Sequence, residues 1–183
     1  MKIKYLAAIL PFSLTGLFTG IDSVNAQTTK FVCGSWRDIP TTVAQTSQGN
    51  VPIIFWVSDW VNDPSSNLTP QNRCETVSQN FQQAYDRGEL KYITTGKKND
   101  QDIVCVAKSD GGVCESQLFT LKPGSNPTES LKQLMNISNN YASGDGKPPL
   151  VQSTGDDSSP RPIYIEFDDF LQQAANAANN AAE

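Results

Sequence analysis

The longest regular alternation of apolar and polar positions predicts a helix over 69–88. Apolar side chains recur there at intervals of three and four residues, which places them on one helix face: Cys74, Val77, Phe81, Ala84 and Tyr85. Thr69 stands at the N-cap position, Pro70 suits the first helical position, and Gly88 suits the end. We therefore expect this helix to lie flat on a sheet, with Cys74 facing inward.

Shorter apolar stretches predict β-strands at 31–33, 41–44, 51–57, 90–94, 102–107, 113–121 and 163–167. The 51–57 stretch is apolar throughout except for Pro52, which is typical of a central strand covered on both faces. Turn-forming residues at 38–40 and 97–100 separate neighbouring strands. The residues 108–112 predict the turn of a hairpin.

A second helix is predicted to begin with Asn126 as its cap and Pro127 at the first position. Its apolar face is supplied by Leu131, Leu134, Met135 and Ser138. A third helix is expected to start at Asp168, directly after the last strand. Beyond Leu171 the tail consists of Ala, Asn and Gln apart from a final Glu, so we expect fraying, because such side chains offer little apolar area for packing.

These elements predict an α+β fold. We expect a mainly antiparallel sheet of about five to six short strands, a long helix on one face and shorter C-terminal helices. The chain divides into a leader over 1–26, a core domain over 27–138, a flexible loop over 139–162, and a final strand with an Ala/Asn-rich helical tail over 163–183.

The first 26 residues have the pattern of a secretory signal peptide. Lys2 and Lys4 precede an apolar stretch over 5–18, and small residues at Val24 and Ala26 suit cleavage before Gln27. That stretch is shorter than the roughly 20 apolar residues needed to span a bilayer. The sequence therefore predicts export to the periplasm, a thylakoid lumen or the outside. No later stretch could span a membrane, so any membrane association would be peripheral.

Four cysteines follow the leader: Cys33, Cys74, Cys105 and Cys114. An even count in an exported chain indicates two disulfides, for which three pairings exist. A four-residue hairpin loop over 108–111 would place Cys105 directly opposite Cys114, near disulfide range. We therefore favour Cys105–Cys114, which leaves Cys33–Cys74. The spacing contains no C-x-x-C pair, so we expect no metal site and no cofactor.

The composition excludes several classes of function. The chain contains no histidine, which removes Ser-His-Asp and Cys-His nucleophile systems and histidine metal sites. Its formal net charge of −5 argues against nucleic-acid binding and against attraction to anionic lipids. Carboxylates remain as candidate catalytic groups: Asp59, Asp156, Asp157, Glu166, Asp168 and Asp169. Asp168 and Asp169 more plainly charge the start of a helix.

Three tryptophans could contribute to a binding surface. Trp56 lies in the apolar 51–57 strand and is better explained by core packing. Trp60, just beyond that strand, and Trp36 are the candidates for a surface that contacts a partner. We predict that Trp60→Ala would weaken such a contact.

The mature region resembles the cyanobacterial circadian oscillating protein (COP) family, the twenty-three-kilodalton class. The matching segments, in order across about 31–137, are 31–33, 39–43, 54–59, 69–74, 77–81, 90–96, 103–105 and 118–124. The resemblance implies peripheral membrane association and rhythmic expression. It brings no established activity and no catalytic residues.

The sequence is consistent with three functions. The first is a non-catalytic exported module that docks on a membrane-bound partner or an envelope polymer. The second is a hydrolase or glycan-acting enzyme, for which Asp59, Glu166 or the Asp156–Asp157 pair would have to converge in a pocket. The third is a small inhibitor that inserts a loop near Trp36 or Pro64 into an enzyme.

Overall fold

A computed structural model of the protein describes residues 29–57, 68–134 and 162–180. The expectations for the leader, for Trp60 and for nearly all of the 139–162 loop fall outside these residues. The same holds for three of the candidate carboxylates, Asp59, Asp156 and Asp157, and for Pro64.

The described strands form two antiparallel sheets. Sheet A has the order β1–β2–β3, with bounds Lys30–Trp36, Ile39–Thr46 and Gly49–Phe55. Sheet B has the order β6–β5–β4–β7, with bounds Ser116–Thr120, Gln101–Ala107, Tyr92–Lys98 and Ile165–Glu166. The α+β class and the antiparallel pairing are confirmed, with the strands divided between two sheets rather than joined in one.

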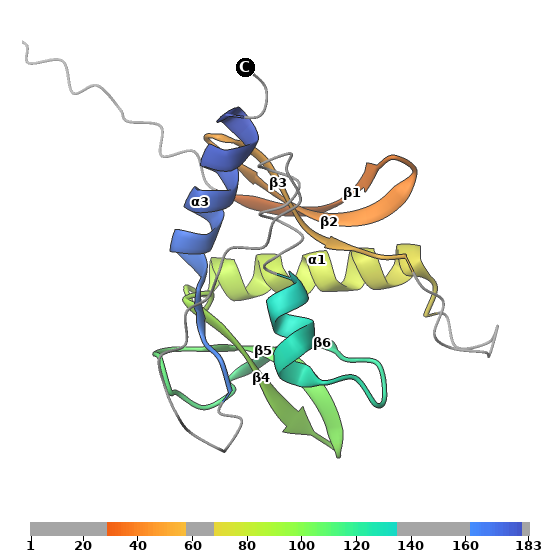
Figure 1. Ribbon diagram of the computed structural model, residues 1–183, viewed down its shortest axis with the longest axis vertical. Coiled ribbons are helices and arrows are strands. Elements are labelled where there is room, and N and C mark those ends of the chain that lie inside the picture. The colour runs from red at the N-terminus through yellow and green to blue at the C-terminus, as the bar shows by residue number, and fades with distance from the viewer. Residues whose placement is uncertain (1–28, 58–67, 135–161, 181–183) are drawn as a thin grey trace, which may run out of the picture.

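Helix α1, Pro70–Asp86, lies between the two sheets, and α3, Phe167–Asn180, crosses from β7 to β3 (Figure 1). A further helix begins at Pro127 and is described as far as 134, where Leu131 and Leu134 are buried as predicted. Asn126 caps it, because its Oδ1 accepts a hydrogen bond from the backbone N–H of Glu129. The core therefore forms where both sheets meet α1.

Helix α1 has the boundaries that the sequence predicts. The Thr69 hydroxyl accepts a hydrogen bond from the backbone N–H of Asn72 at 3.2 Å. Gly88, just after the end of the helix, has the left-handed conformation with φ +67°. The predicted stripe faces inward: Cys74, Val77, Phe81 and Ala84 are buried and Tyr85 is half-buried. A cap, a proline and a glycine at the right spacing were sufficient here, because each acts within one turn of the chain.

Strand β3 lies at the edge of sheet A, so the prediction of a central strand was wrong. Thr42 pairs with Ile54 while Val43 pairs with Pro52, which makes Ile53 an extra residue, a β-bulge. The bulge lets consecutive apolar side chains turn toward buried surroundings, and α3 packs against the same strand. An uninterrupted apolar sequence therefore arose from a bulge at an edge rather than from a strand with two neighbours.

The β5–β6 hairpin has a longer connection than predicted. Cys105 pairs with Gln117 rather than lying opposite Cys114, and the connection covers 108–115. The disulfide pairing is nevertheless confirmed: Cys105 bonds to Cys114 and Cys33 bonds to Cys74. The loop folds back so that Cys114 reaches Cys105 with a Cα–Cα distance of 5.6 Å.

The prediction that the chain frays beyond Leu171 was wrong. Helix α3 continues to Asn180, and Ala174 and Ala175 are only 2% exposed. Small side chains let the helix backbone come close to its neighbours, so alanine packs well although each side chain buries little area. Ala174 and Ala175 therefore belong to the core, while Gln172, Gln173 and Asn176 are exposed.

Trp56 lies in the core, as predicted, with its polar atom satisfied. It is 4% exposed, and its indole Nε1–H donates to the Thr42 hydroxyl at 3.0 Å, which also accepts from the Ser78 hydroxyl at 3.2 Å. Phe119 meets the ring edge-on, and the Arg73 guanidinium lies 4.5 Å from its centre. One buried hydroxyl on β2 thus joins α1 to the residue that directly follows β3.

Thr42→Val is expected to lower the free energy of unfolding by about 1–3 kcal/mol, because it leaves two buried donors without an acceptor. Thr95→Val, at a half-buried position whose hydroxyl joins no such network, is the control and is expected to change it by less than about 0.5 kcal/mol. Urea unfolding of both variants measures the difference. Equal stability of the two would show that the Thr42 network contributes nothing.

Candidate functional site

On the face of sheet A that is turned away from α1, the described strand residues are uncharged except at one end. Cross-strand partners share a face, so the register defines three uncharged rows. The rows are Val32–Val43–Pro52, Gly34–Thr41–Phe55 and Trp36–Ile39–Val57. The polar row of Lys30, Gln45 and Asn50 closes the face at the opposite end.

The row of Trp36, Ile39 and Val57, here named the tip row, is the most exposed of the three uncharged rows. Trp36 is 42% exposed and Val57 is 72% exposed. Trp36 pairs with Ile39, and Val57 follows Trp56, whose backbone N–H donates to the carbonyl of Pro40, so the register brings Val57 beside Ile39. Sequence reasoning found Trp36 and missed the other two, because only strand register brings them together.

A two-residue turn, Arg37 and Asp38, connects Trp36 and Ile39 of the tip row. Arg37 and Asp38 have φ values of 49° and 65°, the left-handed conformation that a tight hairpin requires at both central positions. The predicted turn at 38–40 is therefore shifted toward the N-terminus, since Ile39 and Pro40 belong to β2. The two turn residues have opposite charges, so the tip carries no net charge beside its apolar row.

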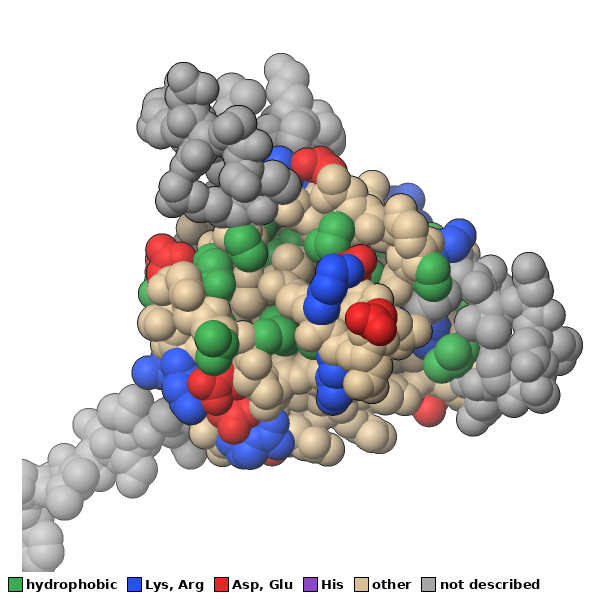
Figure 2. Space-filling model, turned by 90° about the horizontal axis from the view of Figure 1, so that it is seen from below, with side chains coloured by type: hydrophobic (Ala, Val, Ile, Leu, Met, Phe, Trp, Pro, Cys, Tyr) green, Lys and Arg blue, Asp and Glu red, His purple; other side chains and the backbone are tan. Residues whose placement is uncertain are grey.

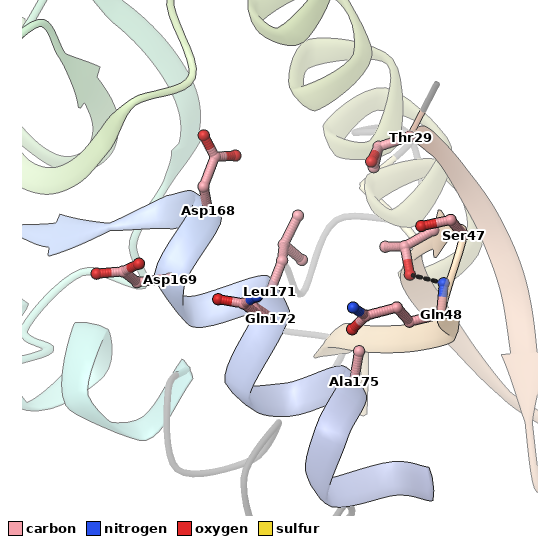
Figure 3. A pocket seen from close by; sticks show the side chains of 9 residues that line it. Thr29, Ser47, Gln48, Asp168, Asp169, Leu171, Gln172 and Ala175 are labelled. Atoms are coloured by element: carbon pink, nitrogen blue, oxygen red, sulfur yellow. Dashed lines mark hydrogen bonds between the residues drawn. The ribbon is translucent and has the colours of Figure 1, made fainter. Parts of the chain in front are cut away.

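Asp168 and Asp169 line an open cavity of about 290 Å³ between the start of α3 and the β2–β3 turn (Figure 3). The opposite wall is formed by Thr29, Thr46, Ser47 and Gln48, and the helix adds Leu171, Gln172 and Ala175. The two carboxylates point in different directions in Figure 3 rather than toward one another. Carboxylate-based glycoside hydrolysis needs two carboxylates that flank the scissile bond, and this pair does not provide that arrangement.

Glu166 caps the start of α3 instead. Its carboxylate accepts a hydrogen bond from the backbone N–H of Asp169 at 2.6 Å, which satisfies one of the free donors at the start of α3. The described carboxylates of the enzyme hypothesis are therefore explained by the helix start. None of the wall residues on the β2–β3 turn was a sequence candidate, because only the packing of α3 against β3 creates the cavity.

The surface formed by β4, β5 and the 108–115 loop, on the sheet B side of the molecule, differs from the uncharged face of sheet A. Seen from below in Figure 2, its hydrophobic side chains are separated by polar and charged ones. Lys108 and Glu115 form an ion pair at 2.8 Å, which raises the pKa of Lys108. Arg87 and Ser116 donate hydrogen bonds to Glu89 and lower the pKa of its carboxyl group. Such exposed pairs organise a solvated surface.

Within 29–57, 68–134 and 162–180, no group of three potential metal ligands comes together. No helix in the same ranges has the length and apolar character to cross a membrane.

Comparison with known proteins places the chain in a family. The sequence pattern described as circadian oscillating protein COP23 matches residues 30–172, which includes both sheets, α1 and both disulfides. No curated protein and no solved structure shows a significant match. The match covers well over half of the chain, and the chain belongs to the circadian oscillating protein COP23 family.

Proposed function

We propose that the protein is a non-catalytic exported module that associates peripherally with a membrane by docking its tip row on a membrane-bound protein. The exposure of Trp36 and Val57 in one row at the end of a stapled sheet is the observation that carries this proposal. Tryptophan is one of the residue types enriched at the energetic centres of protein interfaces. Two disulfides suit an oxidising compartment, which agrees with the signal-peptide pattern of the leader.

The free energy available from burying the tip row favours a protein partner over direct contact with lipid. Burying the exposed parts of three apolar side chains contributes on the order of 4 kcal/mol. A myristoyl chain, at about 0.8 kcal/mol for each buried CH₂, gives only marginal membrane binding by itself. The net charge of −5 adds no attraction to anionic lipids. A shaped protein pocket for Trp36 supplies the complementarity that a bilayer lacks.

Trp36→Ala is expected to weaken binding of the mature protein to washed membranes of its source organism by about thirtyfold, the effect of losing a 2 kcal/mol anchor. The matched control is Val113→Ala, since Val113 is 77% exposed but lies on the 108–115 loop, away from sheet A. Co-sedimentation over a range of membrane concentrations measures both variants. Circular dichroism checks that each variant is folded.

Protease treatment of the membranes before the assay is expected to abolish binding. Equal binding to vesicles made only from the extracted lipids would reject the protein partner. Equal binding of Trp36→Ala and the unaltered protein would reject the tip row as the docking surface.

A further inference from the structure

The two disulfides are placed differently in the fold. Cys33 lies in β1 and Cys74 in α1, so regular elements hold both cysteines of the first bond. Cys105 lies in β5, paired with Thr94 of β4, and is 0% exposed. Its partner Cys114 lies in the 108–115 loop and is exposed. The second bond therefore joins a buried strand to a surface loop.

We propose that Cys105–Cys114 is a redox-sensitive disulfide, which a dithiol reductant reduces selectively while Cys33–Cys74 stays oxidised. A thiolate of the reductant attacks Sγ of Cys114, the S–S bond breaks, and Cys105 leaves as a thiolate that takes up a proton. The second thiol of the reductant, as a thiolate, then attacks the mixed disulfide and releases Cys114. The cysteine pair gains two electrons and two protons, and the reductant becomes its own disulfide.

Access to the sulfur atoms makes the reaction selective. The exchange needs an attacking thiolate in contact with one sulfur of the bond. Cys74 is fully buried and Cys33 is half-buried, with the Gln71 side-chain amide 3.8 Å from its Sγ. Cys114 is the exposed residue among the four, so we expect a dithiol to reach its sulfur first.

The fate of each opened bond also differs. Reduced Cys33 and Cys74 stay in β1 and α1 with their Cα atoms 5.4 Å apart, so they are positioned to close again. Once Cys114 is reduced, hydrogen bonds link the loop to the rest of the described fold. The Tyr164 hydroxyl donates to the Gly112 carbonyl, and the Glu115 N–H donates to the Val106 carbonyl. The Lys108–Glu115 ion pair joins the two ends of the loop to each other.

Release of the loop changes the surface of sheet B. The Cys114 side chain packs over Gly96 so closely that a Cβ atom there would lie 2.9 Å from Sγ of Cys114 and 3.7 Å from that of Cys105. Once the bond is open, departure of the loop uncovers this part of β4 and the Cys105 thiol. The outer face of β4 and β5 is therefore a surface whose exposure depends on the redox state.

Limited reduction tests the proposal on the intact mature protein. Dithiothreitol is added for increasing times, free thiols are blocked with N-ethylmaleimide, and a peptide digest is analysed by mass spectrometry. We expect Cys105 and Cys114 to be labelled at least tenfold faster than Cys33 and Cys74. Equal rates, or earlier labelling of Cys33 and Cys74, would overturn the proposal.

A second measurement tests the role of the loop. Tyr164→Phe removes the 2.7 Å hydrogen bond to Gly112 and is expected to speed labelling of Cys114. The control is Tyr92→Phe, on β4. The Tyr92 hydroxyl forms no hydrogen bond within the described residues, so this change is expected to leave the labelling rate unchanged.

Hydrogen exchange tests the release of the loop. The double variant Cys105→Ser with Cys114→Ser lacks the disulfide, as the reduced protein does. Its amide exchange is expected to rise in 108–115 and to stay low in α1. Unchanged exchange in the loop would contradict its release.

Discussion

Replacing Cys33 and Cys74 together with alanine is expected to lower the free energy of unfolding by about 4 kcal/mol. This bond joins residues 41 positions apart, so in the chain-entropy model it strongly restricts the unfolded chain. The corresponding fall in melting temperature is about 10 °C for a domain of this size. Guanidinium unfolding and calorimetry under non-reducing conditions measure the two quantities.

The matched control is the pair Cys105→Ala with Cys114→Ala. That bond joins residues 9 positions apart, and the same model gives a cost of about 2.5 kcal/mol. The first variant should therefore be the less stable by more than 1 kcal/mol. A larger loss from the second variant would mean that loop closure does not determine the effect, and that native packing around the bonds does.

Gly96→Ala is expected to lower the free energy of unfolding by about 1–3 kcal/mol, because a methyl group there overlaps the disulfide that covers it. The added Cβ would lie 2.9 Å from Sγ and 3.2 Å from Cβ of Cys114, so the loop or β4 has to move. Gly34→Ala is the control. It is also a strand glycine, and its Cβ would meet the nearest atom, on Val43, at 3.4 Å.

A double-mutant comparison separates this clash from the intrinsic preference of alanine in a strand. In the background of Cys105→Ala and Cys114→Ala, the sulfur atoms are gone and most of the cost of Gly96→Ala should disappear. Thermal unfolding of the four combinations gives the coupling energy. A cost that stays the same in both backgrounds would exclude the disulfide as its cause.

Local signals predicted the helices well. Thr69, Pro70 and Gly88 bound α1 as expected, and Asn126 caps the next helix. Each of these residues acts through hydrogen bonds or dihedral preferences within one turn, so no distant partner is needed to recognise them. The α+β class follows from such local patterns.

Features that depend on long-range pairing were not predictable in the same way. The bulge at Ile53 gave β3 the apolar pattern of a central strand. The pairing of Cys105 with Cys114 was predicted correctly for an incorrect reason, because the loop is longer than four residues and bends back. The tip row and the cavity beside α3 arise only when strand register and helix packing are known, so sequence named Trp36 without its neighbours.

The position of α1 has a consequence for how the protein unfolds. Buried side chains of α1 form one apolar cluster with residues from both sheets, so neither sheet has a complete core of its own. Loss of one sheet would expose the helix and remove the support of the other. We expect both halves to melt in a single cooperative transition rather than as two independent subdomains.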